Sequence, residues 1–324
     1  MNKISAITND AFTINFTISN KCNYNCKYCP ASSKDGSTPF ISADEYVQFF
    51  TNVFLDNPQI KNYKRKIVTI TGGEPSIYPE IEKILKFFKL HDFKIVMISN
   101  GSAKADFWIQ NSDYIDTLCL SYHPRYAVIE KIDAVVRSMV EQNKKVVLQI
   151  LMDANFWDKA VAASNFFRKY DAITINHKAV QKKFGIASQS EIGQLADYTE
   201  EQITFIQNEP SIRNKINENY ARIYYENGES EIFDGQKIII NKLNHFKGFL
   251  CGTGQSSLVI KQDGRVTGST CCMKGSVFGN LVSNRQLRIK LFDKKLICIK
   301  EICNCVYDQR IEKKSPTGIE PVRD

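Results

Sequence analysis

The stretch FTINFTISNKCNYNCKYCP, residues 12–30, joins an apolar segment to a loop that carries three cysteines. Residues 12–18 alternate apolar and polar side chains and are rich in Phe, Ile and Thr, a pattern that predicts a β-strand. Cys22, Cys26 and Cys29 follow at the spacings C-x3-C and C-x2-C. The sequence therefore predicts a cysteine loop at the carboxyl end of a first strand.

Strand and helix patterns alternate outward from this loop. Predicted strands cover residues 12–18, 67–71, 94–99, 117–121, 145–152 and 172–176. Between them, helical spacing of apolar residues predicts helices near 42–54, 79–88, 103–111, 128–139 and 155–169. This alternation favours an α/β fold with a parallel sheet, curled into a partial (β/α)6 TIM-type barrel that binds ligands at the carboxyl ends of its strands. We expect a core at 1–180, a connector with helices and a hairpin at 181–245, and a small Cys-rich domain at 246–324.

Composition narrows the class of protein. Hydrophobic residues make up 43% of the 324 residues, enough for a full core. The sequence has no apolar run of membrane-spanning length and no apolar signal core at its start, so we expect a cytoplasmic protein without a membrane partner. The net charge of +8 is most simply explained by a Lys-rich solvated surface, and it would also suit an anionic partner such as a nucleotide, a phosphorylated sugar or nucleic acid.

The ten cysteines are distributed unevenly, which points to metal sites rather than a disulfide framework. Three neighbouring thiolates can bind three irons of a [4Fe-4S] cluster and leave the fourth iron open to a ligand. A zinc site is the alternative, but zinc usually takes four ligands, and the next cysteine after Cys29 is Cys119. Cys119 lies within a predicted strand, so we expect it in the core.

Two motifs together resemble the radical S-adenosylmethionine (SAM) superfamily. They are the run from Cys22 to Cys29, with Tyr28 before the last cysteine, and Gly72-Gly73-Glu74-Pro75 after the second predicted strand. The resemblance covers about residues 12–180. It implies that Cys22, Cys26 and Cys29 hold a [4Fe-4S] cluster whose open iron binds SAM. A reductant such as flavodoxin or ferredoxin would supply the electron that cleaves SAM to a 5′-deoxyadenosyl radical, which abstracts a substrate hydrogen.

The same resemblance implies which other residues meet the cofactor. The expected SAM-binding residues lie in the cysteine loop, in the glycine motif and at the ends of later strands: Tyr28, Gly72, Gly73, Glu74, Ser99, Asn100, Ser121, Met152 and Asn176. Acid–base candidates also follow predicted strands, namely Tyr122, His123 and Asp153, with His177 as a further histidine at a strand end. The simpler interpretation of each is an ordinary hydrogen-bonded residue of a loop.

Six further cysteines fall between residues 251 and 305. A predicted hairpin at 258–266 and the pair Gly279-Asn280 accompany them, and this segment resembles the C-terminal auxiliary-cluster domain called SPASM, or its shortened form, twitch. The final run, Cys298-x4-Cys303-x-Cys305, is shorter than in a full SPASM domain and favours one auxiliary [4Fe-4S] cluster. The implied ligands are Cys251, Cys271, Cys303 and Cys305, with Cys272 and Cys298 as substitutes and structural zinc as the alternative metal.

The function implied is a radical SAM oxidoreductase or isomerase that modifies a nucleotide, sugar, amino acid or peptide. Only about eleven residues precede the first predicted strand, so we expect no peptide-recognition domain there. Together with the basic charge, this favours a small-molecule or nucleotide-type substrate. The alternatives are a peptide-modifying maturase and a non-catalytic Fe–S protein for redox chemistry or sensing.

Overall fold

The computed structural model describes residues 3–180, 197–209, 211–212, 220–233, 238, 242–271, 275–303 and 305–316. The chain divides into two compact units, each assembled from separate stretches of sequence. Unit 1 comprises residues 1–16, 41–68 and 218–324, and unit 2 comprises residues 17–40 and 69–217. The sequence-based domain boundaries at 180 and 245 stay predictions.

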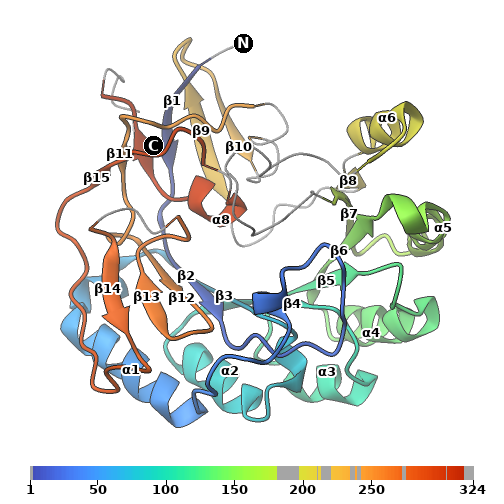
Figure 1. Cartoon of the computed structure of the whole chain (residues 1–324), viewed down its shortest axis with the longest axis horizontal. Coiled ribbons are helices and arrows are strands. Elements are labelled where there is room, and N and C mark those ends of the chain that lie inside the picture. Colours follow the sequence, from blue (N-terminus) through green and yellow to red (C-terminus); the bar gives the residue numbers. More distant parts are fainter. Residues whose placement is uncertain are drawn as a thin grey trace. The chain divides into compact units, whose positions relative to one another are not determined.

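Unit 2 is an α/β arrangement of mainly parallel strands (Figure 1). Its strands are the end of β3 (Arg65–Thr71), β4 (Lys94–Ser99), β5 (Thr117–Tyr122), β6 (Lys145–Met152), β7 (Thr174–Ala179) and β8 (Ser211–Ile212). β4, β5, β6 and β7 pair in parallel in that order, whereas β8 runs antiparallel to β7. The predicted α/β class is therefore confirmed, with a mixed rather than a purely parallel sheet.

The helices of unit 2 follow the strands along the chain. They are η1 (Ala31–Ser33), η3 (Pro75–Ile77), α2 (Ile81–Leu90), α3 (Ala105–Asn111), α4 (Ile129–Glu141), η4 (Ala154–Phe156), α5 (Trp157–Phe167) and α6 (Glu200–Asn208). Apolar residues repeat at helical spacing, as in α4, where Ile132, Val135, Val136 and Met139 are all buried. Figure 1 shows α2, α3 and α4 along one side of the parallel strands.

Unit 1 contains two sets of strands. The first is antiparallel and consists of β1 (Ile4–Thr8), β9 (Ala221–Tyr225), β10 (Ser230–Phe233), β11 (Leu250–Cys251), β15 (Leu296–Ile297) and β16 (Lys313–Lys314), in the order β10-β9-β1-β16-β11-β15. The second consists of β2 (Ala11–Thr17), β12 (Ser257–Ile260), β13 (Arg265–Thr267) and β14 (Val277–Asn280). The helices are α1 (Ala43–Asp56), η2 (Pro58–Asn62) and α8 (Val306–Gln309).

The start of α1 illustrates how local sequence determines an element. Ser42 accepts a hydrogen bond from the Glu45 main-chain N–H at 3.3 Å, and the Glu45 carboxylate accepts one from the Ser42 N–H at 2.9 Å. This reciprocal capping box satisfies two N–H groups that a helix start leaves without partners. The apolar face of α1 then buries Tyr46, Phe49 and Phe50.

Two features of unit 1 differ from the sequence-based expectations. β1 is a strand at residues 4–8, so the expectation that about eleven residues precede the first strand is wrong. β12 pairs in parallel with β2, with Ser257 opposite Thr13 and Ile260 opposite Phe16. The antiparallel pairing of β12 and β13 confirms the predicted hairpin at 258–266. This hairpin is joined through β12 to the N-terminal strand β2.

The hairpin predicted at Glu226-Asn227-Gly228 is confirmed, since β9 and β10 pair antiparallel on either side of it. Of the polar segment 185–220, the structure describes α6 and β8, and the part at 181–196 lies outside the described residues.

Among the described helices, none combines the length and the apolar character that crossing a bilayer requires.

Candidate functional site: two cysteine groups

The three cysteines Cys22, Cys26 and Cys29 lie on a loop that follows β2 and folds back on itself. Residues after the third cysteine return to pair with residues before the first: the Cys22 N–H donates to Lys34 O at 3.3 Å, and the Gly36 N–H donates to Asn20 O at 3.1 Å. The Lys34 ammonium donates to Cys26 O at 2.5 Å. The loop is therefore closed by its own main chain, with a cation bonded to its middle.

The three thiols lie close enough to influence one another electrostatically. Burial raises the pKa of Cys22 and Cys26, and it raises the pKa of Cys29 to about 11, with the neighbouring thiols adding to the shift. Within the described part of the chain, no three His, Cys, Asp or Glu side chains converge as ligands of a single metal ion. Three cysteine thiols on one loop, with the Lys34 ammonium bonded to its main chain, fit a multinuclear iron–sulfur cluster, which takes one thiolate per iron.

The Gly72-Gly73 pair packs directly on the main chain of this loop. The Gly73 N–H donates to Ser19 O at 2.9 Å, and the Glu74 N–H donates to Lys21 O at 2.9 Å. A Cβ atom on Gly73 would lie 2.2 Å from Lys21 O, and one on Gly72 would lie 2.5 Å from Ser19 O. Only glycine permits this approach, so the motif fixes the backbone that leads into Cys22.

The Glu74 carboxylate is 1% exposed and joins the ends of β3 and β4. It accepts hydrogen bonds from Ser99 Oγ at 2.7 Å, from the Asn100 N–H at 2.7 Å and from the Ser76 N–H at 2.9 Å. Burial raises its pKa, and these donors oppose that shift. The carboxylate thus supports the site from within the protein, and a contact with the SAM ammonium stays a prediction.

Asn100 carries this network to the first cysteine. Its Nδ2 donates to Asn23 Oδ1 at 2.9 Å and lies 3.9 Å from Cys22 Sγ. Asn23 in turn donates to Ser102 Oγ at 2.8 Å. Glu74, Asn100 and Cys22 therefore form a continuous chain of contacts, and the sequence analysis had not singled out Asn23.

An aromatic cluster surrounds the second cysteine. Nδ1 of His123 lies 2.6 Å from Tyr28 Oη and 3.4 Å from Cys26 Sγ. The His123 ring stacks on Tyr28 and meets Tyr24 edge-on, and Tyr24 stacks on Tyr126. Burial lowers the pKa of His123 to about 4, so the imidazole is neutral at pH 7. Tyr24 and Tyr126 were missed from the sequence, because only the tyrosine nearest the third cysteine belongs to the motif.

Strand register decides which predicted residues share a face. Ser121 pairs with Gln149, and Gln149 pairs with Asn176, so the three form one row across β5, β6 and β7. Ser99 pairs with Leu120, so the residues that follow them, Asn100 and Ser121, come next to each other. Asn100 therefore continues the row of Ser121. Since Asn100 contacts Cys22, this row belongs to the face that carries the cysteine loop.

The adjacent row points to the opposite face, because side chains alternate along a strand. Tyr122, Ile150 and His177 form this row, and Met152 lies two residues beyond Ile150 on the same side. His177 Nε2 lies 2.8 Å from Ser164 Oγ of α5, and its Nδ1 contacts Glu209 O. The expectation that His177 faces the site is therefore wrong, and Tyr122 and Met152 are buried on the same side as His177.

Asp153 lies nearer to the loop. Its carboxylate caps η4 by accepting the Asn155 N–H at 3.0 Å. Its charge adds to the raised pKa of Cys26 and of Tyr28, although burial is the larger cause for both groups. The structure thus brings Asp153, His123 and Tyr28 together around Cys26, and the catalytic roles of Asp153 and His123 stay predictions.

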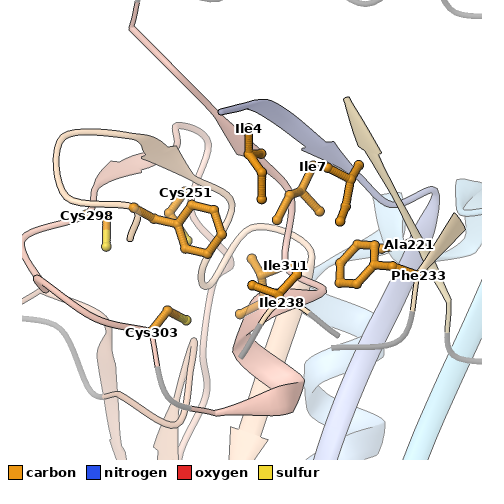
Figure 2. Close-up of a cluster of buried hydrophobic side chains, with 11 residues drawn as sticks. Ile4, Ile7, Ala221, Phe233, Ile238, Cys251, Cys298, Cys303 and Ile311 are labelled. Carbon is orange, nitrogen blue, oxygen red and sulfur yellow. The ribbon is translucent and has the colours of Figure 1, made fainter. Parts of the chain in front are cut away.

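The second cysteine group lies within unit 1. Cys251, Cys298 and Cys303 belong to one buried cluster that also contains Ile4 and Ile7, and Figure 2 shows these cysteines at one end of it. Cys271 packs against the cluster, and Cys305 immediately precedes α8. Cys272 lies outside the described residues.

Burial raises the pKa of Cys251 and Cys303, and it raises the pKa of Cys305 to about 11. The thiols also influence each other, Cys298 acting on Cys251, and Cys271 and Cys305 acting on Cys303. Four of these thiols lie in or against one buried cluster, with Cys305 close enough to influence Cys303, which is compatible with a cysteine-ligated centre. Of the described cysteines, two groups account for all but one. The exception is Cys119, which is 6% exposed, as expected of a core residue.

Comparisons with known proteins agree with the geometry of the first group. Residues 16–123 match the family described as the Radical SAM superfamily. An S-adenosylmethionine-dependent nucleotide dehydratase of Flammeovirga pacifica is 30% identical over 122 residues, which cover 37% of this chain and 41% of that protein. YydG of Bacillus subtilis, provisionally assigned to peptide biosynthesis, is 25% identical over 141 residues, or 41% of this chain and 42% of that protein.

Among solved structures, SuiB of Streptococcus suis bound to S-adenosylmethionine aligns with a TM-score of 0.48 at 13% identity, covering 81% of this chain and 61% of that chain. The chain spans about two fifths of the length of the two curated relatives above. The matched family residues include all three cysteines of the loop and the Gly72-Gly73-Glu74 motif. Residues 16–123 are therefore similar to the radical SAM superfamily, and this similarity implies a [4Fe-4S] cluster and SAM as cofactors.

Proposed function

We propose that the protein cleaves SAM reductively and uses the resulting radical to abstract a hydrogen atom from its substrate. The observation that carries this proposal is the closed loop of Cys22, Cys26 and Cys29, onto which the Gly72-Gly73 backbone packs at hydrogen-bond distance. When bound, the cluster supplies one electron to SAM, and a reductant such as flavodoxin or ferredoxin replaces it.

The residues of the chain hold and orient this chemistry. The three thiols bind the cluster, and Asn100 and Asn23 fix the position of Cys22 through their hydrogen bonds. The row of Ser121, Gln149 and Asn176 presents polar groups on the same face, where they can orient the hydroxyl and amine groups of SAM. The half-buried aromatic residues around Cys26 would limit the access of water to that side of the site.

We also propose the finer architecture. The α/β units of residues 1–180 would form the partial six-stranded barrel expected from the sequence. The second cysteine group would hold an auxiliary [4Fe-4S] cluster in a twitch-like arrangement, with ligands drawn from Cys251, Cys271, Cys303 and Cys305. The mutual influence of Cys303, Cys271 and Cys305 supports three members of this set.

For the substrate, we propose a nucleotide-type small molecule. The net charge of +8 suits an anionic ligand, and the Flammeovirga relative is named a nucleotide dehydratase. A peptide substrate is the second candidate, favoured by the relative YydG, which is assigned to peptide biosynthesis.

Anaerobic reconstitution with iron, sulfide, reductant and SAM tests the proposal. The expected result is 5′-deoxyadenosine formation, abolished by changing Cys22, Cys26 and Cys29 to Ala. Nucleoside triphosphates and short peptides are then added separately, and the true class is the one that raises 5′-deoxyadenosine formation above the substrate-free rate. The enzymatic interpretation fails if reconstituted protein neither produces 5′-deoxyadenosine nor shows a SAM-dependent change in the cluster's EPR spectrum.

A further inference from the structure

Lys313 is a lysine buried inside unit 1. Only 2% of its surface is exposed, although lysine is almost never fully buried without a compensating charge. Its ammonium donates to the main-chain oxygens of Asp308 and of Ile311, the latter at 3.1 Å, and it lies 5.1 Å from the centre of the Phe246 ring. Among the described residues no carboxylate lies within ion-pair distance of this ammonium.

The neighbours of Lys313 are cysteines. On the paired strands β16 and β11, Lys313 stands directly opposite Cys251, so the two side chains share a face of the sheet. The Phe246 ring beneath the ammonium belongs to the same buried cluster as Cys251 and Cys303. The one cation buried in this core therefore lies among the thiols of the second group, as far as the described residues extend.

Asp308 is the nearby acid that could balance Lys313, but its carboxylate has other partners. Both of its oxygens accept main-chain N–H groups, from Thr270 and from Cys271, each at 2.9 Å. It thus fixes the Cys271 loop beside α8. The nearby Asp308 carboxylate, whose two oxygens are already bonded to main-chain amides, and the two carbonyl dipoles therefore balance only part of the charge of Lys313.

A cysteine-ligated metal centre would supply further negative charge beside this ammonium. The two positive charges of an oxidised [4Fe-4S] core against four thiolates leave a net charge of about −2 at the centre. In a low-dielectric core such a charge is costly alone, and a fixed cation beside it offsets part of the cost.

We propose that Lys313 is the buried counter-charge of the metal centre held by the second cysteine group, and that it favours both metal retention and, for an iron centre, the more reduced state. This rests on the proposed function, which assigns a metal centre to those cysteines. Lys313 would act as a positioning residue through the charge of its ammonium, without touching the substrate.

The test uses the full chain with Cys22, Cys26 and Cys29 changed to Ala, so that bound metal reports only on the second group. In this background Lys313→Met and Lys313→Gln remove the charge, Gln keeping a hydrogen-bond donor, whereas Lys313→Arg keeps the charge. Lys314→Met is the matched control, because Lys314 is the adjacent residue of β16 and points to the opposite face. Metal retention is measured by chelator competition.

We expect at least tenfold weaker metal retention in the Met and Gln variants and little change in the Arg and Lys314→Met proteins. For an iron centre, loss of the positive charge should also make reduction less favourable. The midpoint potential should then fall by about 59 mV for each tenfold decrease in the equilibrium constant for reduction. If Gln behaves like the parent protein, Lys313 acts only as a hydrogen-bond donor, and the proposal is wrong. If the parent background binds neither iron nor zinc, the assignment of a second metal centre is what fails.

A Met variant that does not fold is distinguished by urea unfolding of metal-loaded and metal-stripped protein. A counter-charge stabilises only the loaded form, so Lys313→Gln should lower the stability of loaded protein more than that of stripped protein. Equal losses in the two forms would mean a purely structural lysine and would overturn the proposal.

Discussion

The hydroxyl of Tyr28 lies 2.6 Å from Nδ1 of His123, and the two rings are nearly parallel, at 10°. Tyr28 comes from the cysteine loop and His123 from the residue that follows β5, so this pair ties the loop to the sheet of unit 2. Because Cys26 Sγ lies 3.4 Å from the same imidazole nitrogen, the pair also limits where the second thiol can go.

Changing Tyr28 to Phe removes the hydroxyl and keeps the stacked ring. We expect the free energy of unfolding to fall by about 1 kcal/mol, as for one lost hydrogen bond, with the iron content of the first group unchanged. Urea unfolding and iron analysis measure the two effects. Tyr63→Phe is the control, since the Tyr63 hydroxyl makes a weaker contact, with Gln255 O at 3.5 Å. A Tyr28→Phe protein as stable as the parent would contradict the contact with His123.

Changing Gly73 to Ala should disrupt the cysteine loop, because the new Cβ atom would lie 2.2 Å from Lys21 O. We expect a loss of about 1–3 kcal/mol in unfolding free energy and a marked loss of iron at the first group. The control is Gly228→Ala, where nothing lies within 4 Å of the added atom and only the positive φ of 86° is strained. That variant should keep its iron, and full iron occupancy in Gly73→Ala would count against the close packing.

Asn176 and His177 are adjacent on β7, and their side chains face opposite sides of the sheet. Variants on the two sides should therefore separate an effect on SAM binding from an effect on stability. Asn176→Ala should weaken SAM binding several-fold, because it removes an amide from the face of the cysteine loop. Ser164→Ala should leave SAM binding unchanged and cost about 1–3 kcal/mol, since it leaves the buried His177 Nε2 without its partner. Equilibrium dialysis with SAM and urea unfolding measure both. Weakened SAM binding in Ser164→Ala would show that the two faces are wrongly assigned.

The Asp116 carboxylate should make the free energy of unfolding depend on pH. Burial alone would raise its pKa, but Lys89 at 2.8 Å and the Ile95 N–H at 2.8 Å outweigh this and hold the pKa below its ordinary value of 3.8. A lowered folded-state pKa means that the contribution is full above the unfolded pKa and is lost as pH falls through the folded pKa. Asp116→Asn should therefore lose about 1–3 kcal/mol at pH 7, and this loss should begin to shrink as pH falls below about 4.

Urea unfolding of Asp116→Asn and the parent protein between pH 3 and pH 7 measures this difference. The exposed pair of Lys86 and Glu82 on α2 provides the control, and Glu82→Gln should have little effect at either pH. If the difference in unfolding free energy between the parent and Asp116→Asn is the same at all pH values, the charge of the Asp116 carboxylate does not stabilise the fold.

Much of the α/β part of the fold could be predicted from local sequence. The strands at 94–99 and 145–152 match β4 and β6 residue for residue, and the Ser42 capping box marks the start of α1. These elements are recognisable because their signals lie within a few residues of one another. β1 and the pairing of β12 with β2 could not be predicted in the same way, because each depends on partners more than 200 residues away.

The site was predictable where spacing alone carries the chemistry, as in the loop from Cys22 to Cys29. It was not predictable where the choice of face matters. A parallel strand covered on both sides is apolar throughout, so its sequence does not reveal which residues point toward the ligand. Tyr122 and His123 are adjacent, and only the register shows that the first is on the side of His177.

The pairing of β1 and β2 with distant strands has a consequence for how the chain is made. β2 is complete only when residues 257–260 reach it, and Ala6 of β1 meets Lys314 near the other end of the chain. At a synthesis rate of about 5–20 residues per second, the first strands wait roughly 15–60 s on the ribosome before their partners emerge. During that interval an apolar strand edge is open to other chains, so cells that supply chaperones to the nascent chain should yield more soluble protein.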